Sequence, residues 1–119
     1  MIALKNAELV QGQALKFTDV IDGVAKADAW GEPDAAHGAV TRYAAGHHVP
    51  LHTHTYDMKI VVIAGTLLHG DAQGRITRLG PGSYCFIPDG QKHTLGCEKD
   101  EDCLFYEEQP GKFDIKAVK

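Results

Sequence analysis

Three histidines, His52, His54 and His93, are the residues of this sequence best placed to carry out chemistry. If the chain is extended here, His52 and His54 point to the same side of a strand, with Cα atoms about 6.6 Å apart. Two imidazoles at this spacing can reach one metal ion at about 2.0–2.1 Å. His93 follows a turn at the start of another strand-forming segment, so it is the best candidate for a third ligand.

Short runs of strand-forming residues must position these histidines, because such runs dominate the chain from about Gly38 onward. They are residues 40–43, 59–64, 66–69, 75–79, 84–87, 93–97 and 104–107. Turn-forming residues separate them, notably at 71–74, 80–82 and 88–90. This pattern predicts an all-β sandwich or barrel. No linker or repeat interrupts it, so we expect one domain over residues 1–119 with a barrel core at about 38–110.

The N-terminal third is harder to interpret. Residues 24–30 alternate with period two, which predicts a strand with Val24 and Trp30 on one face. The three alanines of this segment also suit a helix, but Gly31 and Pro33 follow at once and limit its continuation, so a strand is preferred. We expect this third to supply an edge strand or a dimer arm. Residues 60–64 are apolar on both faces, which predicts a covered central strand or a dimer contact.

The histidines also fall in two longer spacing patterns. The first reads Gly46, five residues, His52-Thr53-His54, three residues, Met58, six residues, Gly65. The second reads Gly82, five residues, Pro88-Asp89-Gly90, two residues, His93, three residues, Cys97. Together they resemble the two motifs of the cupin family across residues 46–97. The resemblance implies a small antiparallel jelly-roll barrel in which the three histidines face inward and bind one divalent transition metal (Fe, Zn, Ni or Mn).

Two positions depart from the cupin pattern. Met58 stands where the family has a glutamate that is usually the fourth ligand, and Cys97 stands where it has an asparagine. A thioether is neutral and a weak acceptor, so we expect three protein ligands and open coordination. Asp57 would need a bulge or turn to reach the metal. Cys97 lies about 13 Å along an extended strand from His93, which excludes it as a ligand to the same ion.

The other histidines and the tyrosines give weaker signals. His47 and His48 are expected at a strand edge or pocket rim, His37 gives no signal, and His69 is expected at a solvated strand end. Met58 is expected to fill the core. Three tyrosines could line a pocket but more commonly lie in a core: Tyr43, Tyr56 and Tyr84.

The open coordination favours a metal-dependent enzyme acting on a small molecule, with the ion as a Lewis acid or O₂-binding centre. Some three-histidine cupins are thiol or β-diketone dioxygenases, so the resemblance implies dioxygenase-like chemistry. The alternative is a non-catalytic module that binds or senses a small ligand or metal. A metal-free, epimerase-like cupin using histidine and tyrosine is the least favoured hypothesis. No general base can be named from the sequence. Small cupins commonly pair, so we expect a homodimer.

Composition excludes some partners. The net charge is −4 and no Lys/Arg cluster occurs, so neither nucleic acid nor an anionic membrane is expected to bind. The longest apolar run, residues 60–68, is about half of the ~20 residues that a spanning helix needs. No signal peptide can be read at the N-terminus, so a cytoplasmic location is the default.

The sequence has three cysteines, and it leaves open whether two of them form a disulfide. Cys97 and Cys103 flank the acidic segment 98–102 and would lie within bridging distance if that segment joined two antiparallel strands. A disulfide would favour an oxidising compartment such as the periplasm. The other interpretation is that both are small buried residues.

Overall fold

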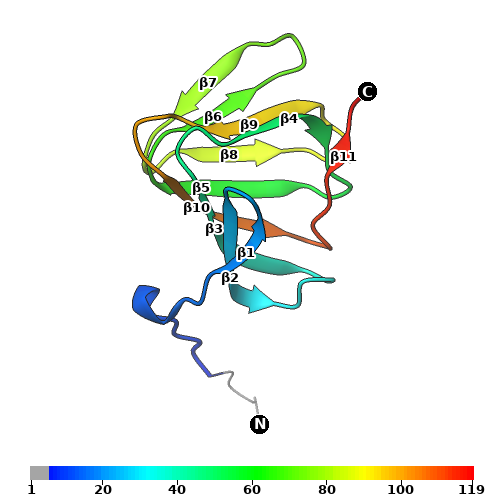
Figure 1. The fold of residues 1–119 in the computed structure, drawn as a ribbon. Helices are drawn as coiled ribbons and strands as arrows, with labels where there is room; N and C mark the ends of the chain where they lie inside the picture. The colour runs from blue at the N-terminus through cyan, green and yellow to red at the C-terminus, as the bar shows by residue number, and fades with distance from the viewer. Residues whose placement is uncertain (1–5) are drawn as a thin grey trace.

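A computed structural model describes residues 6–119 and is almost entirely β (Figure 1). One short 3-10 helix, η1 (Gly12–Ala14), precedes the strands. The strands are β1 (Thr18–Ile21), β2 (Val24–Gly31), β3 (His37–Tyr43), β4 (His48–Thr53), β5 (Met58–Ala64), β6 (Leu67–Gly70), β7 (Ile76–Leu79), β8 (Tyr84–Ile87), β9 (His93–Cys97), β10 (Cys103–Gln109) and β11 (Lys116–Ala117). Within this part of the chain, no helix has the length and hydrophobicity needed to cross a membrane.

The strands form two antiparallel sheets that face each other. One sheet has six strands in the order β1-β2-β3-β10-β5-β8, and the other has five in the order β11-β4-β9-β6-β7. In Figure 1 the five-stranded sheet lies above the six-stranded one. The all-β, jelly-roll prediction is confirmed.

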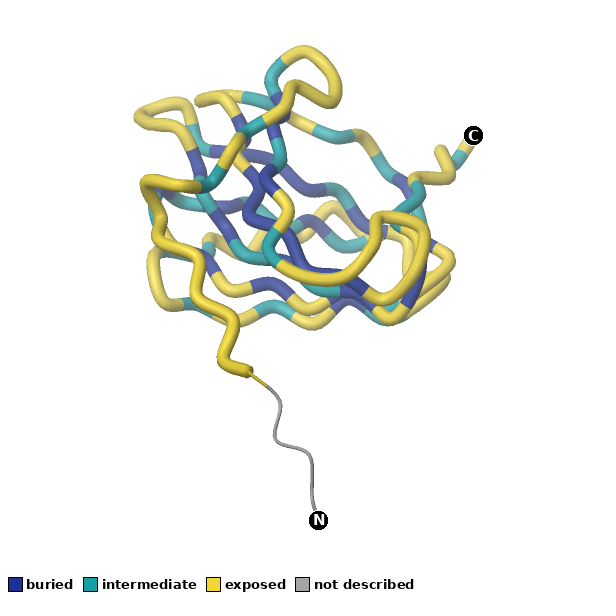
Figure 2. Tube along the Cα trace, turned by 90° about the horizontal axis from the view of Figure 1, so that it is seen from below, coloured by how far each residue is buried: buried dark blue, intermediate teal, exposed yellow. Residues whose placement is uncertain are grey.

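The core lies between the sheets, where Figure 2 shows most of the buried chain. Strand β5 illustrates how the sequence builds it, because buried and exposed residues alternate along the strand. Ile60 and Val62 are buried, whereas Val61 and Ile63 are 41% and 47% exposed on the outer face. The run of apolar residues predicted at 60–64 is therefore covered on one face only within this chain.

The predicted strands largely match those observed. Segments 84–87 and 93–97 coincide with β8 and β9, and the preference for a strand over a helix at residues 24–30 is confirmed by β2. The prediction that Val24 and Trp30 share a face is wrong. The pairing of β2 with β3 shifts register between Asp28 and Trp30, and an extra residue in one strand reverses the face of those that follow. Val24 is buried in the core, whereas Trp30 is 40% exposed.

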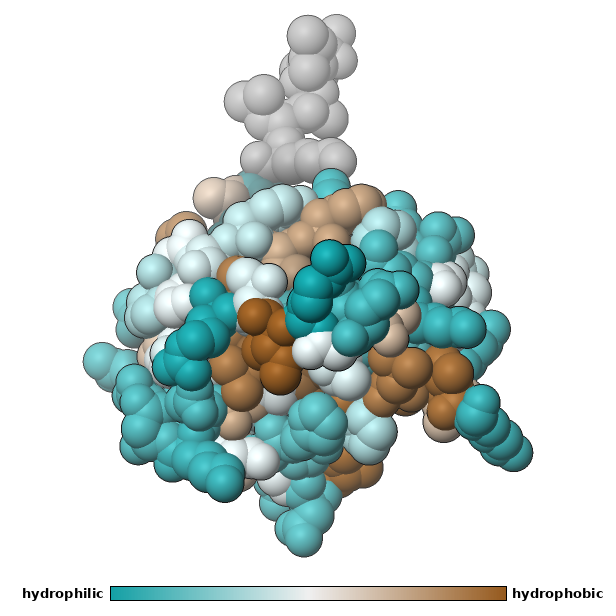
Figure 3. Space-filling model, turned by 90° about the horizontal axis from the view of Figure 1, so that it is seen from above, coloured by the Kyte–Doolittle hydropathy of each residue, from teal (hydrophilic) through white to brown (hydrophobic). Residues whose placement is uncertain are grey.

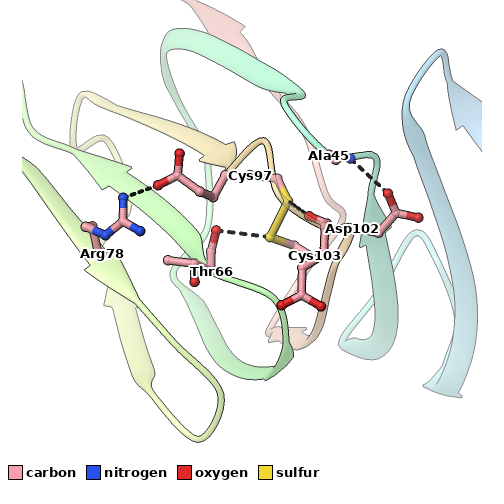
Figure 4. Close-up of a disulfide and its surroundings, with 8 residues drawn as sticks. Ala45, Thr66, Arg78, Cys97, Asp102 and Cys103 are labelled. Atoms are coloured by element: carbon pink, nitrogen blue, oxygen red, sulfur yellow. Dashed lines mark hydrogen bonds and ion pairs between the residues drawn. A yellow bond between two sulfur atoms is a disulfide. The ribbon is translucent and has the colours of Figure 1, made fainter.

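Of the two interpretations of Cys97 and Cys103, the structure has the disulfide. It joins Cys97 at the end of β9 to Cys103 at the start of β10, with Cα atoms 5.8 Å apart (Figure 4). These strands belong to different sheets, so the bridge links the two layers instead of two neighbours in one sheet. In the same connection, Asp102 accepts a hydrogen bond from the backbone N–H of Ala45 at 2.9 Å. The bridge also excludes Cys97 as a metal ligand, as the sequence predicted.

Trp30 packs over a glycine on the outer face of the six-stranded sheet. Its indole nitrogen donates to the Tyr106 hydroxyl at 2.6 Å. Both side chains lie over Gly38, where an added Cβ would stand 2.1 Å from the indole nitrogen and 2.4 Å from the hydroxyl. The absence of a side chain at position 38 therefore allows this contact to form.

We predict that Gly38→Ala displaces Trp30 and destabilises the protein by about 1 kcal/mol, the usual worth of one such hydrogen bond. Trp30 is the chain's single tryptophan, so its fluorescence emission reports the displacement as a red shift, and urea unfolding measures the loss of stability. Gly80→Ala is the control, because nothing lies within 4 Å of its added Cβ. Unchanged emission in Gly38→Ala would contradict the prediction.

Candidate metal centre

The structure brings His52, His54 and His93 together inside the five-stranded sheet. His52 lies in β4 and pairs directly across the sheet with His93, the first residue of β9. His54 follows β4 by one residue and returns to the same side. All three are buried, with 2%, 4% and 0% of their surfaces exposed. One ring nitrogen from each histidine lies within 4.8 Å of those of the other two.

Backbone carbonyls fix the orientation of the three rings. Each Nδ1 lies at hydrogen-bond distance from a carbonyl oxygen, which can only accept, so each Nδ1 carries the proton. The partners of His52, His54 and His93 are, in order, the carbonyls of Pro50 (2.7 Å), Asp114 (2.5 Å) and Gln91 (3.0 Å). Each Nε2 therefore keeps its lone pair for a metal ion, the arrangement typical of metal-binding histidines.

The donor set fits a divalent transition metal. The Nε2 atom of His93 is buried and has no hydrogen-bond partner among the described residues, and a buried polar atom rarely goes unsatisfied without a reason. Burial lowers the pKa of His52, and it lowers that of His93 to about 4. Both imidazoles are thus neutral near pH 7, which is the form that binds metal. The three-histidine group is positioned to hold a metal ion.

No carboxylate joins the histidines among the described residues. Met58 is buried in the core, as predicted. Asp57 instead accepts a hydrogen bond from the backbone N–H of Asp89 at 2.8 Å, which holds the turn that precedes β9. Asp57 therefore contributes to the position of His93 without contacting the ion site.

A cavity of about 310 Å³ opens beside the histidines. His52, His54 and Met58 line it together with a largely apolar wall. The apolar lining residues are Val20, Ile21, Val24, Val49, Leu95, Phe105, Phe113 and Ile115. The cavity has room for a small organic molecule in contact with an ion on the histidines.

The opposite wall carries polar residues that the sequence analysis missed. Lys26, Thr41 and Glu107 line the same cavity from β2, β3 and β10. The Lys26 ammonium lies 2.7 Å from Glu107 Oε1, and the Thr41 hydroxyl donates to the same oxygen at 2.6 Å. Inward-facing and outward-facing residues alternate along β10, and Glu107 follows the inward-facing Phe105 by two residues. This alternation was the signal that could have placed Glu107 in the cavity.

The remaining histidines do not join the cluster. His48 is exposed on β4, and His47 is half-buried with its ring against Tyr43 at 4.9 Å. The expectation that His69 is solvated is wrong. Its ring stacks on that of His93 with centroids 5.6 Å apart, and its Nε2 is buried. His69 follows Leu67 by two residues in β6, so period-two alternation turns it inward.

The tyrosines have different environments. Tyr43 lies in the core and lines the cavity. Tyr56 and Tyr84 are 42% and 58% exposed and line no part of this cavity. Burial and the charge of Glu107 raise the pKa of Tyr43, so its hydroxyl stays protonated at neutral pH.

The lowered pKa of His93 predicts that the metal-free protein loses stability in mild acid. An unfolded histidine takes up a proton near pH 6.5, whereas folded His93 does so near pH 4. Between these values the unfolded chain binds more protons, so the free energy of unfolding falls as the pH decreases from 6.5 to 4. His93→Gln should make this fall shallower.

Thermal melting of chelator-treated protein at several pH values measures this dependence. His48→Gln is the control, because it removes an exposed histidine from β4. An equally steep fall in wild type and His93→Gln would show that His93 does not contribute.

Comparison with known proteins agrees with this architecture. The polyketide cyclase RemF from Streptomyces resistomycificus superposes with a TM-score of 0.82 at 20% identity, covering 96% of this chain and 87% of that chain. A protein with a double-stranded beta-helix domain from Klebsiella pneumoniae gives 0.76 at 19% identity, covering 100% and 98%. A sugar phosphate isomerase of a cupin superfamily from Silicibacter pomeroyi gives 0.71 at 18% identity, covering 87% and 75%.

These structures share the fold of the chain, which confirms the resemblance to cupins. None of the curated proteins matches the chain in sequence. The family model named DUF4437, a domain of unknown function, matches residues 10–119. The chain has a cupin fold and belongs to the DUF4437 family.

Proposed function

We propose that this protein is a metal-dependent enzyme that acts on a small, mostly apolar molecule. One observation carries the proposal: three buried imidazoles turn unprotonated Nε2 atoms toward one point beside an apolar cavity. The candidate ions are Fe, Zn, Ni and Mn, all of which accept imidazole nitrogen. A divalent ion in such a site supplies Lewis acidity or a binding site for O₂.

The chain's own residues would bind and orient the substrate. His52, His54 and His93 would hold the ion and leave coordination positions free on the cavity side, because Met58 replaces the usual carboxylate. The apolar wall would exclude water from the bound molecule.

Two reaction classes fit this site. Dioxygenase-like chemistry is the class that the resemblance to three-histidine cupins implies. Chemistry without oxidation is the second candidate, favoured by the acid-base group Glu107 in the same cavity. Two of the similar structures are named as a cyclase and an isomerase, and neither name describes an oxidation. A non-catalytic module would bind its ligand here without turnover.

Metal content tests the proposal first. We predict that wild-type protein holds one Fe, Zn, Ni or Mn ion per chain, and that His52→Ala lowers the affinity by more than about 100-fold, since loss of an outer partner alone costs 10–100-fold. His48→Ala is the matched control, because it removes an exposed histidine from the same strand. Elemental analysis and competition with a chelator give both values. Wild-type protein that neither retains nor takes up metal would refute the proposal.

Oxygen consumption then distinguishes dioxygenase-like chemistry from chemistry without oxidation and from ligand binding without turnover. Protein loaded with Fe(II) is mixed with cysteine or acetylacetone in an oxygen electrode. Uptake that disappears in His52→Ala supports a dioxygenase. Turnover of a carbonyl compound without uptake supports the second class, and ligand binding without any turnover supports the non-catalytic alternative.

The outer face of the six-stranded sheet supports a homodimer. Val61 lies directly opposite Tyr84 of β8 and Tyr106 of β10, which makes a row of apolar and aromatic side chains across the sheet. Ile63 and Phe86 extend it, at 47% and 46% exposed. Strand β8 is also an edge, with unpaired backbone groups available to a second copy. The view from above shows a surface that is hydrophilic over much of its area, with several separate apolar patches (Figure 3).

We predict that Ile63→Lys converts the proposed dimer to a monomer, because it places a charge within the apolar row that would be buried between the two copies. Sedimentation velocity measures the change. Ile76→Lys is the control, since Ile76 is 63% exposed on β7 of the other sheet. Wild-type protein that sediments as a monomer would contradict the proposed dimer.

The disulfide is relevant to the cellular compartment in which the protein is located. Bridges persist in oxidising environments and are rare in the cytosol of mesophiles. Cys97–Cys103 therefore supports the periplasmic alternative over the cytoplasmic default. Free-thiol counts on protein purified from each compartment distinguish the two.

A further inference from the structure

Glu107 is a carboxylate buried in the wall of an otherwise apolar cavity. It is 2% exposed. Lys26 and Thr41 both contact its Oε1 atom, at 2.7 and 2.6 Å, which leaves Oε2 as the oxygen able to meet a molecule in the cavity. The side chains of Lys26 and Glu107 are 18% and 3% exposed, and such a largely buried ion pair stabilises a fold no better than well-packed apolar side chains do. The position of this pair therefore points to a role in chemistry.

The two polar groups of the cavity lie on opposite sheets. The histidines come from β4, β9 and the residue after β4, whereas Glu107 comes from β10 of the six-stranded sheet. Stacked sheets lie about 10 Å apart, and both groups border one cavity. A small molecule whose oxygen faces the histidines thus has its carbon atoms directed toward Glu107.

Contacts to other elements hold the carboxylate in place. Lys26 lies directly opposite Thr41 in the β2–β3 pairing, so both partners of Oε1 come from one cross-strand pair. The Lys26 ammonium also lies 3.6 Å from the centre of the Phe113 ring. Lys26 and Thr41 are therefore positioning residues for Glu107.

We propose that Glu107 is the catalytic proton carrier of this cavity and that the substrate class is small apolar ketones with a C–H bond beside the carbonyl. The inference rests on the proposed metal-dependent function and selects its non-oxidative class. The carboxylate removes the proton from that carbon, the electron pair of the broken C–H bond forms a C=C bond to the carbonyl carbon, and the π pair of the carbonyl moves onto its oxygen. Return of a proton to the same carbon restores the ketone, with the configuration at that carbon retained or inverted, so atoms and electrons balance without an oxidant or reductant.

Exchange of hydrogen for deuterium tests this role with 2-tetralone, an apolar bicyclic ketone. The ketone is incubated in D₂O with zinc-loaded wild type, Glu107→Gln or Glu108→Gln, and ¹H NMR follows the loss of the signals beside the carbonyl. Glu108→Gln is the matched control, because Glu108 is the next residue of β10 and points to the opposite face. Metal content, melting temperature and ketone binding by saturation-transfer NMR are measured on the same samples.

We expect wild type and Glu108→Gln to accelerate the exchange, and Glu107→Gln to lower the rate by at least about 100-fold, the usual worth of a general base. Zinc content and ketone binding should stay unchanged. Exchange at the wild-type rate in Glu107→Gln, or a wild-type rate equal to that of zinc in buffer, would overturn the inference.

A double variant and the metal-free protein test the role of Glu107 if the first samples fail to fold or to bind zinc. If Glu107→Gln does not fold, Lys26→Met/Glu107→Gln replaces it, since removing both charges avoids an unpaired buried ammonium. If wild type holds no zinc, the proposed function fails separately. Exchange by the metal-free protein then decides the role of Glu107: a rate lost in Glu107→Gln supports it, and no rate above buffer overturns it.

Discussion

The register between β4 and β9 is the constraint on which the site depends. It places His52 directly across from His93, and side chains at such positions lie about 5 Å apart at Cβ. The pairing is irregular between Val49 and His52. A shift of one residue in either strand would turn one histidine out of the core. The carbonyls of Pro50 and Gln91, which orient His52 and His93, lie in or beside these two strands, whereas the carbonyl of Asp114 orients His54 from the C-terminal segment.

Much of the fold and the candidate ligands could be predicted from the sequence, because both follow from local patterns. His-x-His and a histidine preceded by a turn place the three candidate ligands on strands or directly beside one, and turn residues mark most strand ends. Glu107 and His69 were missed for a physical reason. Their inward orientation depends on which strands pair and on which side of each sheet the core forms, so the period-two alternation of β10 and β6 indicates the side of these residues only once the inward face of each strand is known. The bulge that turns Trp30 outward has the same origin.

The two sheets contribute different kinds of polar group to the cavity. The five-stranded sheet contributes neutral nitrogen donors, whereas the six-stranded sheet contributes Lys26, Thr41 and Glu107. Because the Cys97–Cys103 bridge links the ends of β9 and β10, it ties together the two strands that carry His93 and Glu107. The geometry between the walls is thereby restrained at one end of the barrel.

The C-terminal segment joins these walls at the other end. Asp114 accepts the hydrogen bond that orients His54, and its carboxylate holds Thr55. Phe113 meets Lys26, and β11 pairs with the part of β4 that carries His52. The last residues are therefore part of the site and not an appendage to it. A fusion or deletion that displaced β11 would therefore also disturb the ring orientation of His54 and the strand that carries His52.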